Sequence, residues 1–130
     1  HSYTGNPLAC AAALASLEIF ASDEVLARNR ATAARMGELA RGIATLPHVA
    51  EARQTGMIVA FELAPGGDRR AAFDPARRVG LRAYRAALER GVLLRPLGDV
   101  LYWMPPYCID DTQLALLADV TRAAIAEAVA

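Results

Sequence analysis

Lysine is absent from this 130-residue chain, although fourteen arginines are present. Chemistry that needs a lysine amine, such as Schiff-base formation, therefore cannot be completed by this segment alone. Only two cysteines and two histidines occur, and they lack the spacing that is typical of metal sites. We expect no bound metal, and we expect Cys10 and Cys108 to be buried free thiols.

The chain also lacks a net charge and a long apolar run. Fourteen basic residues balance fourteen acidic ones, so no overall field favours nucleic acid or an anionic membrane as a partner. No apolar segment approaches the roughly 20 residues that span a bilayer, and no leader peptide is recognisable. These features predict a soluble, cytoplasmic protein.

The first residues, HSYTGNPLACAAA, lack a methionine and form a polar turn that feeds into an alanine-rich segment. This opening predicts a piece of a longer protein. Asn6 is a favoured N-cap and Pro7 suits the first helical turn, so a helix is expected over residues 7–20. Its small side chains predict close packing against other parts of a protein or an interface.

Periodicity and turn residues predict the order helix, helix, strand, strand, helix, strand, strand, helix. Ser22 is expected to start the second helix, and Asp74 with Pro75 the third, which should end at Gly91. Asp110 and Gln113 resemble a capping box for the last helix. The strands are expected at 49–54, 57–63, 92–94 and 100–103. This order predicts an α+β fold in which helices cover one face of a short antiparallel or mixed sheet.

Arg95 is the residue whose position most favours chemistry. It stands between the apolar segment 91–94 and a Pro-x-Gly turn, so its guanidinium is expected at a strand end. A planar guanidinium there can hold a carboxylate by two parallel hydrogen bonds, although a plain surface arginine fits as well. The aromatic residues near it, Tyr102, Trp103 and Tyr107, wall a pocket in one interpretation and fill the core in the other.

Four other polar residues are weaker candidates. Ser2 precedes the first helix, and such turns bind phosphate in some proteins. His1 and His48 are isolated histidines, and a structural role is expected for His48 beside Pro47. Glu62 lies within an apolar strand and is expected at the edge of the sheet.

Two stretches resemble class III, pyridoxal-phosphate-dependent aminotransferases. HSYTGNPLACAAALASLEIF is similar to the segment of these enzymes in which Gly-Asn-Pro leads into the helix between the large and small domains. GVLLRPLGDVLYWMPPYCI is similar to their C-terminal stretch, and its Met-Pro-Pro-Tyr motif is the more discriminating of the two. The resemblance covers nearly the whole chain, which would form only the last third of such an enzyme.

The resemblance implies roles for three residues and a division into domains. Ser2, with His1 before it, would bind the phosphate of pyridoxal 5'-phosphate held by the neighbouring subunit, and Arg95 would bind the substrate carboxylate. Many relatives have threonine in place of Ser2. Residues 1–20 would end the large domain and form the inter-domain helix, and residues 21–130 would form the C-terminal small domain of a fold-type I enzyme.

The partners implied by the resemblance are small-molecule substrates, a second copy of the chain in a homodimer, and the missing N-terminal part, which would supply the lysine. Alone, this segment is expected to be inactive. Enzymes of the family that use ω-amino acids or diamines remain an alternative, because they also bind carboxylates. A free-standing binding module is an alternative from a different class.

Overall fold

In the computed structural model, which describes residues 4–130, the chain forms four helices and one four-stranded sheet. Two short 3-10 turns, Pro65–Gly67 and Pro75–Arg77, complete the regular structure. The elements are α1 (Pro7–Ser22), α2 (Val25–Ala44), β1 (Val49–Thr55), β2 (Ile58–Leu63), α3 (Val79–Leu88), β3 (Arg95–Leu97), β4 (Val100–Trp103) and α4 (Asp111–Val129). The predicted order of elements is confirmed.

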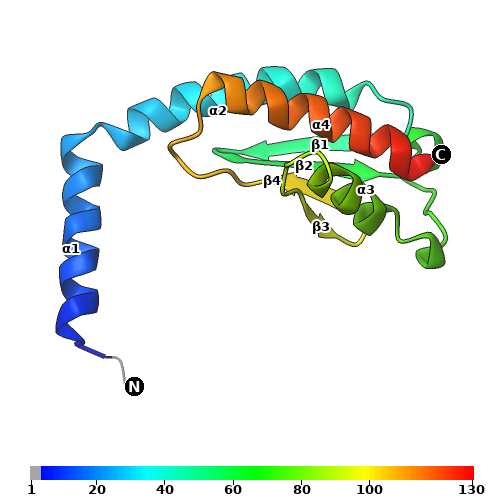
Figure 1. Ribbon diagram of the computed structural model, residues 1–130. Helices are drawn as coiled ribbons and strands as arrows, with labels where there is room; N and C mark the ends of the chain where they lie inside the picture. Colours follow the sequence, from blue (N-terminus) through cyan, green and yellow to red (C-terminus); the bar gives the residue numbers. More distant parts are fainter. Residues whose placement is uncertain (1–3) are drawn as a thin grey trace.

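The sheet is antiparallel throughout, with the strand order β1-β2-β4-β3. Alternation along β2 and β4 sends every second side chain to a buried face, where Val59, Phe61, Leu63, Leu101 and Trp103 lie. Helices α2, α3 and α4 cover that face (Figure 1), and their apolar residues form one core with it. The α+β fold with helices on one face of the sheet is therefore confirmed.

Trp103 joins the sheet to the helical layer. Its ring packs edge-on against Phe61, with 5.0 Å between the ring centroids. Its indole N–H donates to the hydroxyl of Thr121 in α4 at 2.9 Å, and that hydroxyl donates to the Leu117 carbonyl at 2.6 Å. Since both polar groups are satisfied, the buried tryptophan and threonine add packing without an unpaired donor. The predicted capping box at the start of α4 is also present.

The opposite face of the sheet, which we call the open face, carries no buried residue among those that the structure describes. The strand register places its side chains in two rows across the four strands. One row runs Arg53, Ala60, Tyr102, Arg95, and the other runs Glu51, Glu62, Val100, Leu97. Glu62 thus lies on the central strand β2, and its predicted position at the sheet edge is wrong.

Helix α1 extends away from the rest of the chain (Figure 1) and has no buried residue. Its Asn6 cap is as predicted, since Asn6 Oδ1 accepts the Ala9 N–H at 3.1 Å. The helix continues through Ser22, so the predicted cap at that residue is wrong, and α2 follows a left-handed Glu24 with φ of 49°. Cys10 and Cys108 are both exposed, contrary to expectation, because α1 and the segment after β4 pack against little of this chain.

Two predicted boundaries differ from the structure. Asp74 caps only a single 3-10 turn, and α3 begins at Val79 after Arg78, which is left-handed with φ of 47°. Residues 92–94 form no strand, and β3 instead contains Arg95 and Pro96. A proline suits this position because β3 lies at the sheet edge, where one side of the strand needs no donor.

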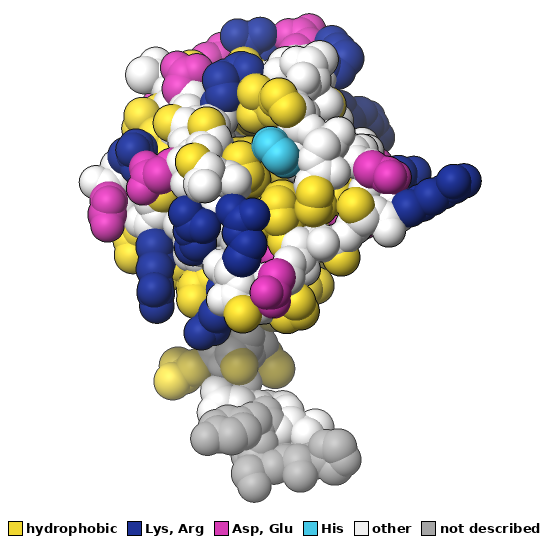
Figure 2. Space-filling model, turned by 90° about the vertical axis from the view of Figure 1, so that its right-hand side faces the viewer, with side chains coloured by type: hydrophobic (Ala, Val, Ile, Leu, Met, Phe, Trp, Pro, Cys, Tyr) yellow, Lys and Arg dark blue, Asp and Glu magenta, His cyan; other side chains and the backbone are white. Residues whose placement is uncertain are grey.

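Three arginines from α3 and its flanks fix the C-terminal end of α4. Arg77 donates to the Val129 carbonyl at 3.0 Å and Arg82 to the Glu127 carbonyl at 3.4 Å, and Arg90 forms a 2.8 Å ion pair with the Glu127 carboxylate. Cations here complement the negative end of the helix dipole. Figure 2 shows that basic side chains alternate with apolar and acidic ones at one face of the molecule.

Gly80 gives a test of this packing. A Cβ at this position would overlap the carbonyl oxygen of Gly98 in the turn between β3 and β4. We expect Gly80→Ala to lower the free energy of unfolding by about 1–3 kcal/mol, the usual cost of overpacking. Urea unfolding followed by the fluorescence of Trp103, the one tryptophan of the chain, measures this change.

Gly42→Ala is the matched control for Gly80→Ala. It lies inside α2, and its added Cβ would meet only the guanidinium of Arg122, at 3.4 Å. Alanine favours a helix interior over glycine by about 1 kcal/mol, so this variant is expected to be neutral or more stable. Equal stability of Gly80→Ala and the unaltered chain would contradict the close approach of α3 to the turn.

Candidate functional site

Arg95 begins β3 at the edge of the sheet and lies on the open face. The segment that precedes it is anchored, since Val92 and Leu94 are buried in the core. The Val92 N–H donates to the Ala87 carbonyl at 3.0 Å, which ties this segment to the end of α3. Gly91, with φ of 76°, makes the turn out of the helix as predicted. The backbone at Arg95 is therefore well fixed, and its side chain is exposed.

The open face carries a second arginine, Arg53, whose charge is already matched. Its Nη1 lies 2.6 Å from Glu62 Oε2 and 2.5 Å from Glu51 Oε2, and Arg69 adds a 3.0 Å ion pair to Glu51. The carboxylate of Glu62, and after it that of Glu51, raises the pKa of the Arg53 guanidinium above its ordinary value. Because that ordinary value is already strongly alkaline, Arg53 stays charged across the neutral range.

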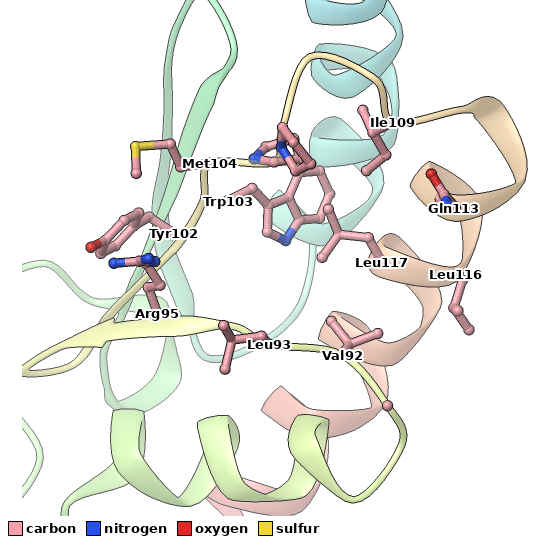
Figure 3. A pocket seen from close by; sticks show the side chains of 13 residues that line it. Val92, Leu93, Arg95, Tyr102, Trp103, Met104, Ile109, Gln113, Leu116 and Leu117 are labelled. Carbon is pink, nitrogen blue, oxygen red and sulfur yellow. The ribbon is translucent and has the colours of Figure 1, made fainter. Parts of the chain in front are cut away.

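Arg95, in contrast, forms no ion pair or side-chain hydrogen bond with any described residue. Its guanidinium presents a planar set of donors at the edge of the open face. A cavity of about 510 Å³ adjoins it, between the segment 91–95, the end of β4 and the start of α4. Figure 3 shows Arg95 and Tyr102 on one side of this cavity and Gln113 and Leu116 of α4 on the other.

The cavity is lined mostly by apolar residues, among them Leu93, Met104 and Pro105. Apolar walls with one unpaired guanidinium suit an anionic group attached to an aliphatic chain. The arrangement can bind and orient a carboxylate. Among the described residues that line it, the one hydroxyl belongs to Tyr102, which lies beside the arginine.

The structure separates the aromatic candidates. Trp103 and Tyr102 both line the same cavity as Arg95, but Trp103 is a buried core residue, whereas Tyr102 lies on the open face of the sheet beside Arg95. Tyr107 lines a different hollow of about 430 Å³, and its ring meets that of Phe20 in α1 with 6.2 Å between the centroids. Of these three aromatic residues, Tyr102 is therefore the one that lies on the same face as Arg95, and the period-two alternation of β4 is the sequence signal that distinguishes it from Trp103.

His48 has the structural role that the sequence predicts for it. His48 Nδ1 accepts the Gly66 N–H at 3.1 Å, and its ring lies 6.0 Å from that of Phe73. In Figure 2 this imidazole is surrounded by apolar side chains. It directly precedes β1, at the edge of the sheet opposite to β3, and its contacts are with Gly66 and Phe73, so it adds nothing to the site around Arg95.

His1 and Ser2 lie outside the described residues, so the structure places neither of them. The described turn that follows contains Gly5, with φ of 73°, and Asn6 at the start of α1. Residues 4–10 are exposed. No helix in the described part of the chain combines the length and apolarity required to cross a bilayer.

Comparison with known proteins gives a consistent result. The sequence model of the family Aminotransferase class-III matches residues 1–125. An adenosylmethionine-8-amino-7-oxononanoate aminotransferase from Nitratidesulfovibrio vulgaris is 42% identical over 125 residues, which cover 96% of this chain and 23% of the relative. One from Synechococcus elongatus is 48% identical over 115 residues, which cover 88% of this chain and 25% of the relative.

Solved structures agree with the sequence relatives. The crystal structure of adenosylmethionine-8-amino-7-oxononanoate aminotransferase from Methanocaldococcus jannaschii matches with a TM-score of 0.92 and 33% identity, covering 98% of this chain and 29% of that one. The PMP-bound aminotransferase from Vibrio fluvialis matches with a TM-score of 0.89 and 25% identity, covering 95% and 27%.

The chain spans about a quarter of the length of the relatives that it matches. Within that span the match is nearly complete and extends over α1, the sheet and its helical layer. On this evidence the chain belongs to the class III aminotransferase family.

Proposed function

We propose that the protein containing this chain transfers an amino group from S-adenosylmethionine to 8-amino-7-oxononanoate, giving 7,8-diaminononanoate in biotin biosynthesis. The names of the relatives supply the substrates. The observation that carries the proposal is the unpaired Arg95 guanidinium beside apolar walls, because the acceptor joins a carboxylate to an aliphatic chain. Arg95 would bind that carboxylate through two parallel hydrogen bonds.

The cofactor implied by the family is pyridoxal 5'-phosphate, which when bound acts as an electron sink. The residues of this chain suit the phosphate group of the cofactor but not its aldehyde. The exposed turn before α1, with the hydroxyl of Thr4 and the backbone amides of residues 4–6, offers the kind of donors that phosphate requires, and Ser2 with His1 would contribute there. No lysine exists in the chain to hold the cofactor's aldehyde, so that residue would come from the missing N-terminal part.

Arg95 and Ser2 would thus divide the work of binding. Arg95 would orient the acceptor by its carboxylate, and the apolar walls of the cavity would exclude water from that pair. Ser2 would hold the phosphate of the cofactor in the neighbouring subunit. Neither residue would move a proton, since the guanidinium and the serine hydroxyl would both act only as hydrogen-bond donors.

The domain division follows from the same proposal. Residues 1–20 would close the large domain and form the helix that links it to the small domain, which residues 21–130 would form. The exposure of α1 supports this division, because Val25 is the first buried residue in the described part of the chain, which begins at residue 4. The apolar residues exposed on α1 would then contact the missing N-terminal part or the second subunit of a homodimer. A cytoplasmic location remains a prediction.

Substrate choice tests the proposal. The full-length enzyme is expected to convert 8-amino-7-oxononanoate with S-adenosylmethionine as the donor, and mass spectrometry of the diamine product measures its rate. A diamine and an ω-amino acid serve as comparison donors at the same concentration. Faster formation of product with either of them would favour the alternative branch of the family, and no conversion of the acceptor with any donor would reject the proposal.

A further inference from the structure

Tyr102 is the one residue directly opposite Arg95 in the sheet. β3 is an edge strand that pairs only with β4, and the register makes these two residues partners. The Cβ atoms of such partners in antiparallel strands lie about 4.5–5.5 Å apart on the same face. Both side chains line the 510 Å³ cavity and also a second hollow of about 280 Å³, which Tyr84 and Leu94 share with them. Figure 3 shows the phenol ring next to the guanidinium. The ring therefore forms the wall on the β4 side of Arg95.

The other described residues of its row do not restrain the Arg95 side chain. Its long side chain is exposed and has no polar partner among the described residues, so several rotamers are accessible to it. The next side chain across the row, Ala60, is too short to reach it, and Arg53 at the far edge is bound to its own carboxylates. Two half-buried tyrosines, each with only two rotatable bonds, share a hollow with Arg95. Tyr102 lies directly opposite Arg95 in the sheet and also lines the larger cavity, whereas Tyr84 belongs to α3 and does not line that cavity.

We propose that Tyr102 is a positioning residue for the carboxylate site, and that its ring, not its hydroxyl, holds the Arg95 guanidinium in the orientation that binds a carboxylate. Guanidinium groups pack favourably against aromatic rings. The proposal rests on the proposed function of Arg95. Since Tyr102 acts on binding through Arg95, its loss weakens binding of the acceptor and leaves the chemical step intact.

The test compares Tyr102→Leu with Tyr102→Phe in the full-length holoenzyme. Tyr102→Leu is expected to raise the KM for the carboxylate acceptor by about tenfold, in keeping with the strength of ring–guanidinium contacts, and to change kcat by less than about twofold. Tyr102→Phe keeps the ring and should stay within about twofold of the unaltered enzyme. An equal rise in KM in both variants would assign the effect to the hydroxyl and overturn the proposal. An unchanged KM in Tyr102→Leu would also overturn it.

Tyr107→Leu is the matched control, because this exposed tyrosine lines neither hollow beside Arg95. It should leave the KM of the acceptor unchanged. Cofactor content, measured by absorbance, shows whether each variant has folded. If Tyr102→Leu fails to retain cofactor, the comparison of Tyr102→Phe with Tyr102→His decides, since histidine shortens the ring and Phe does not. A higher KM for the acceptor in Tyr102→Phe than in Tyr102→His would then overturn the proposal.

A double variant separates this proposal from the proposed function. In an Arg95→Ala background, Tyr102→Leu should add less than about twofold to the KM, because its effect passes through the missing guanidinium. A further tenfold rise would show that Tyr102 acts independently, and would overturn the positioning role alone. Arg95→Ala with an unchanged KM would reject the carboxylate assignment of Arg95, and the role of Tyr102 with it.

Discussion

Replacing Arg95 with alanine is expected to lower kcat/KM for the carboxylate acceptor by roughly thirty- to several-thousand-fold. The change removes one partner of a charge-assisted pair that the rest of the enzyme would shield from water, a loss of about 2–5 kcal/mol. Arg95→Lys keeps the positive charge and loses the planar pair of donors, so an intermediate loss is expected. Steady-state kinetics of the full-length enzyme with varied acceptor concentration measure both variants.

Arg53→Ala is the control for this experiment. Arg53 lies on the same face of the sheet, at the other end of the same row, but is bound to Glu51 and Glu62. Its replacement should leave kcat/KM for the acceptor within about threefold. If Arg95→Ala also slowed acceptor turnover by less than about threefold, Arg95 would be a surface residue and its assignment to the substrate carboxylate would be withdrawn.

The chain alone is expected to show no transaminase activity and to bind no pyridoxal phosphate covalently through a side chain. The reason is the complete absence of lysine, since no other side chain of this chain supplies the amine that the cofactor's aldehyde requires. Incubation with pyridoxal phosphate, reduction with borohydride and intact-mass spectrometry measure the adduct.

The α-amino group has to be blocked by acetylation before this measurement, because it also reacts with aldehydes. The full-length enzyme, incubated and reduced in the same way but without acetylation, is the positive control and should retain one cofactor per subunit. A stoichiometric adduct on a side chain of the acetylated chain would show that the missing part is not needed for covalent attachment. That result would contradict the division of the site between two parts of the enzyme.

Local chemistry allowed the fold to be predicted where neighbouring residues determine it. The capping box of Asp110 and Gln113, the Asn6 cap and the alternation in β2 and β4 all depend on residues within a few positions of one another. Tertiary contacts decided the cases that were predicted wrongly. The pairing of β3 with β4 places Arg95 and Pro96 inside a strand, although Pro-x-Gly is typical of a turn.

One residue of the candidate site, Arg95, could be predicted from the sequence, but the residues that surround it could not. Arg95 is recognisable because an arginine interrupts an apolar segment, and the family resemblance gives it a role. The difference between Arg95 and Arg53 is not visible in the sequence, because it depends on ion pairs formed across strands. The pairing of Tyr102 with Arg95 likewise required the register of the sheet.

The most direct test of the account removes the carboxylate from the ligand as well as the guanidinium from the protein. Binding of 8-amino-7-oxononanoate and of its neutral amide would be measured by competition in the unaltered enzyme and in Arg95→Ala. If Arg95 binds the substrate carboxylate, the unaltered enzyme prefers the acid by at least roughly thirtyfold, as expected for a shielded charge pair, and Arg95→Ala binds both alike. An equal preference for the acid in the two proteins would contradict the account.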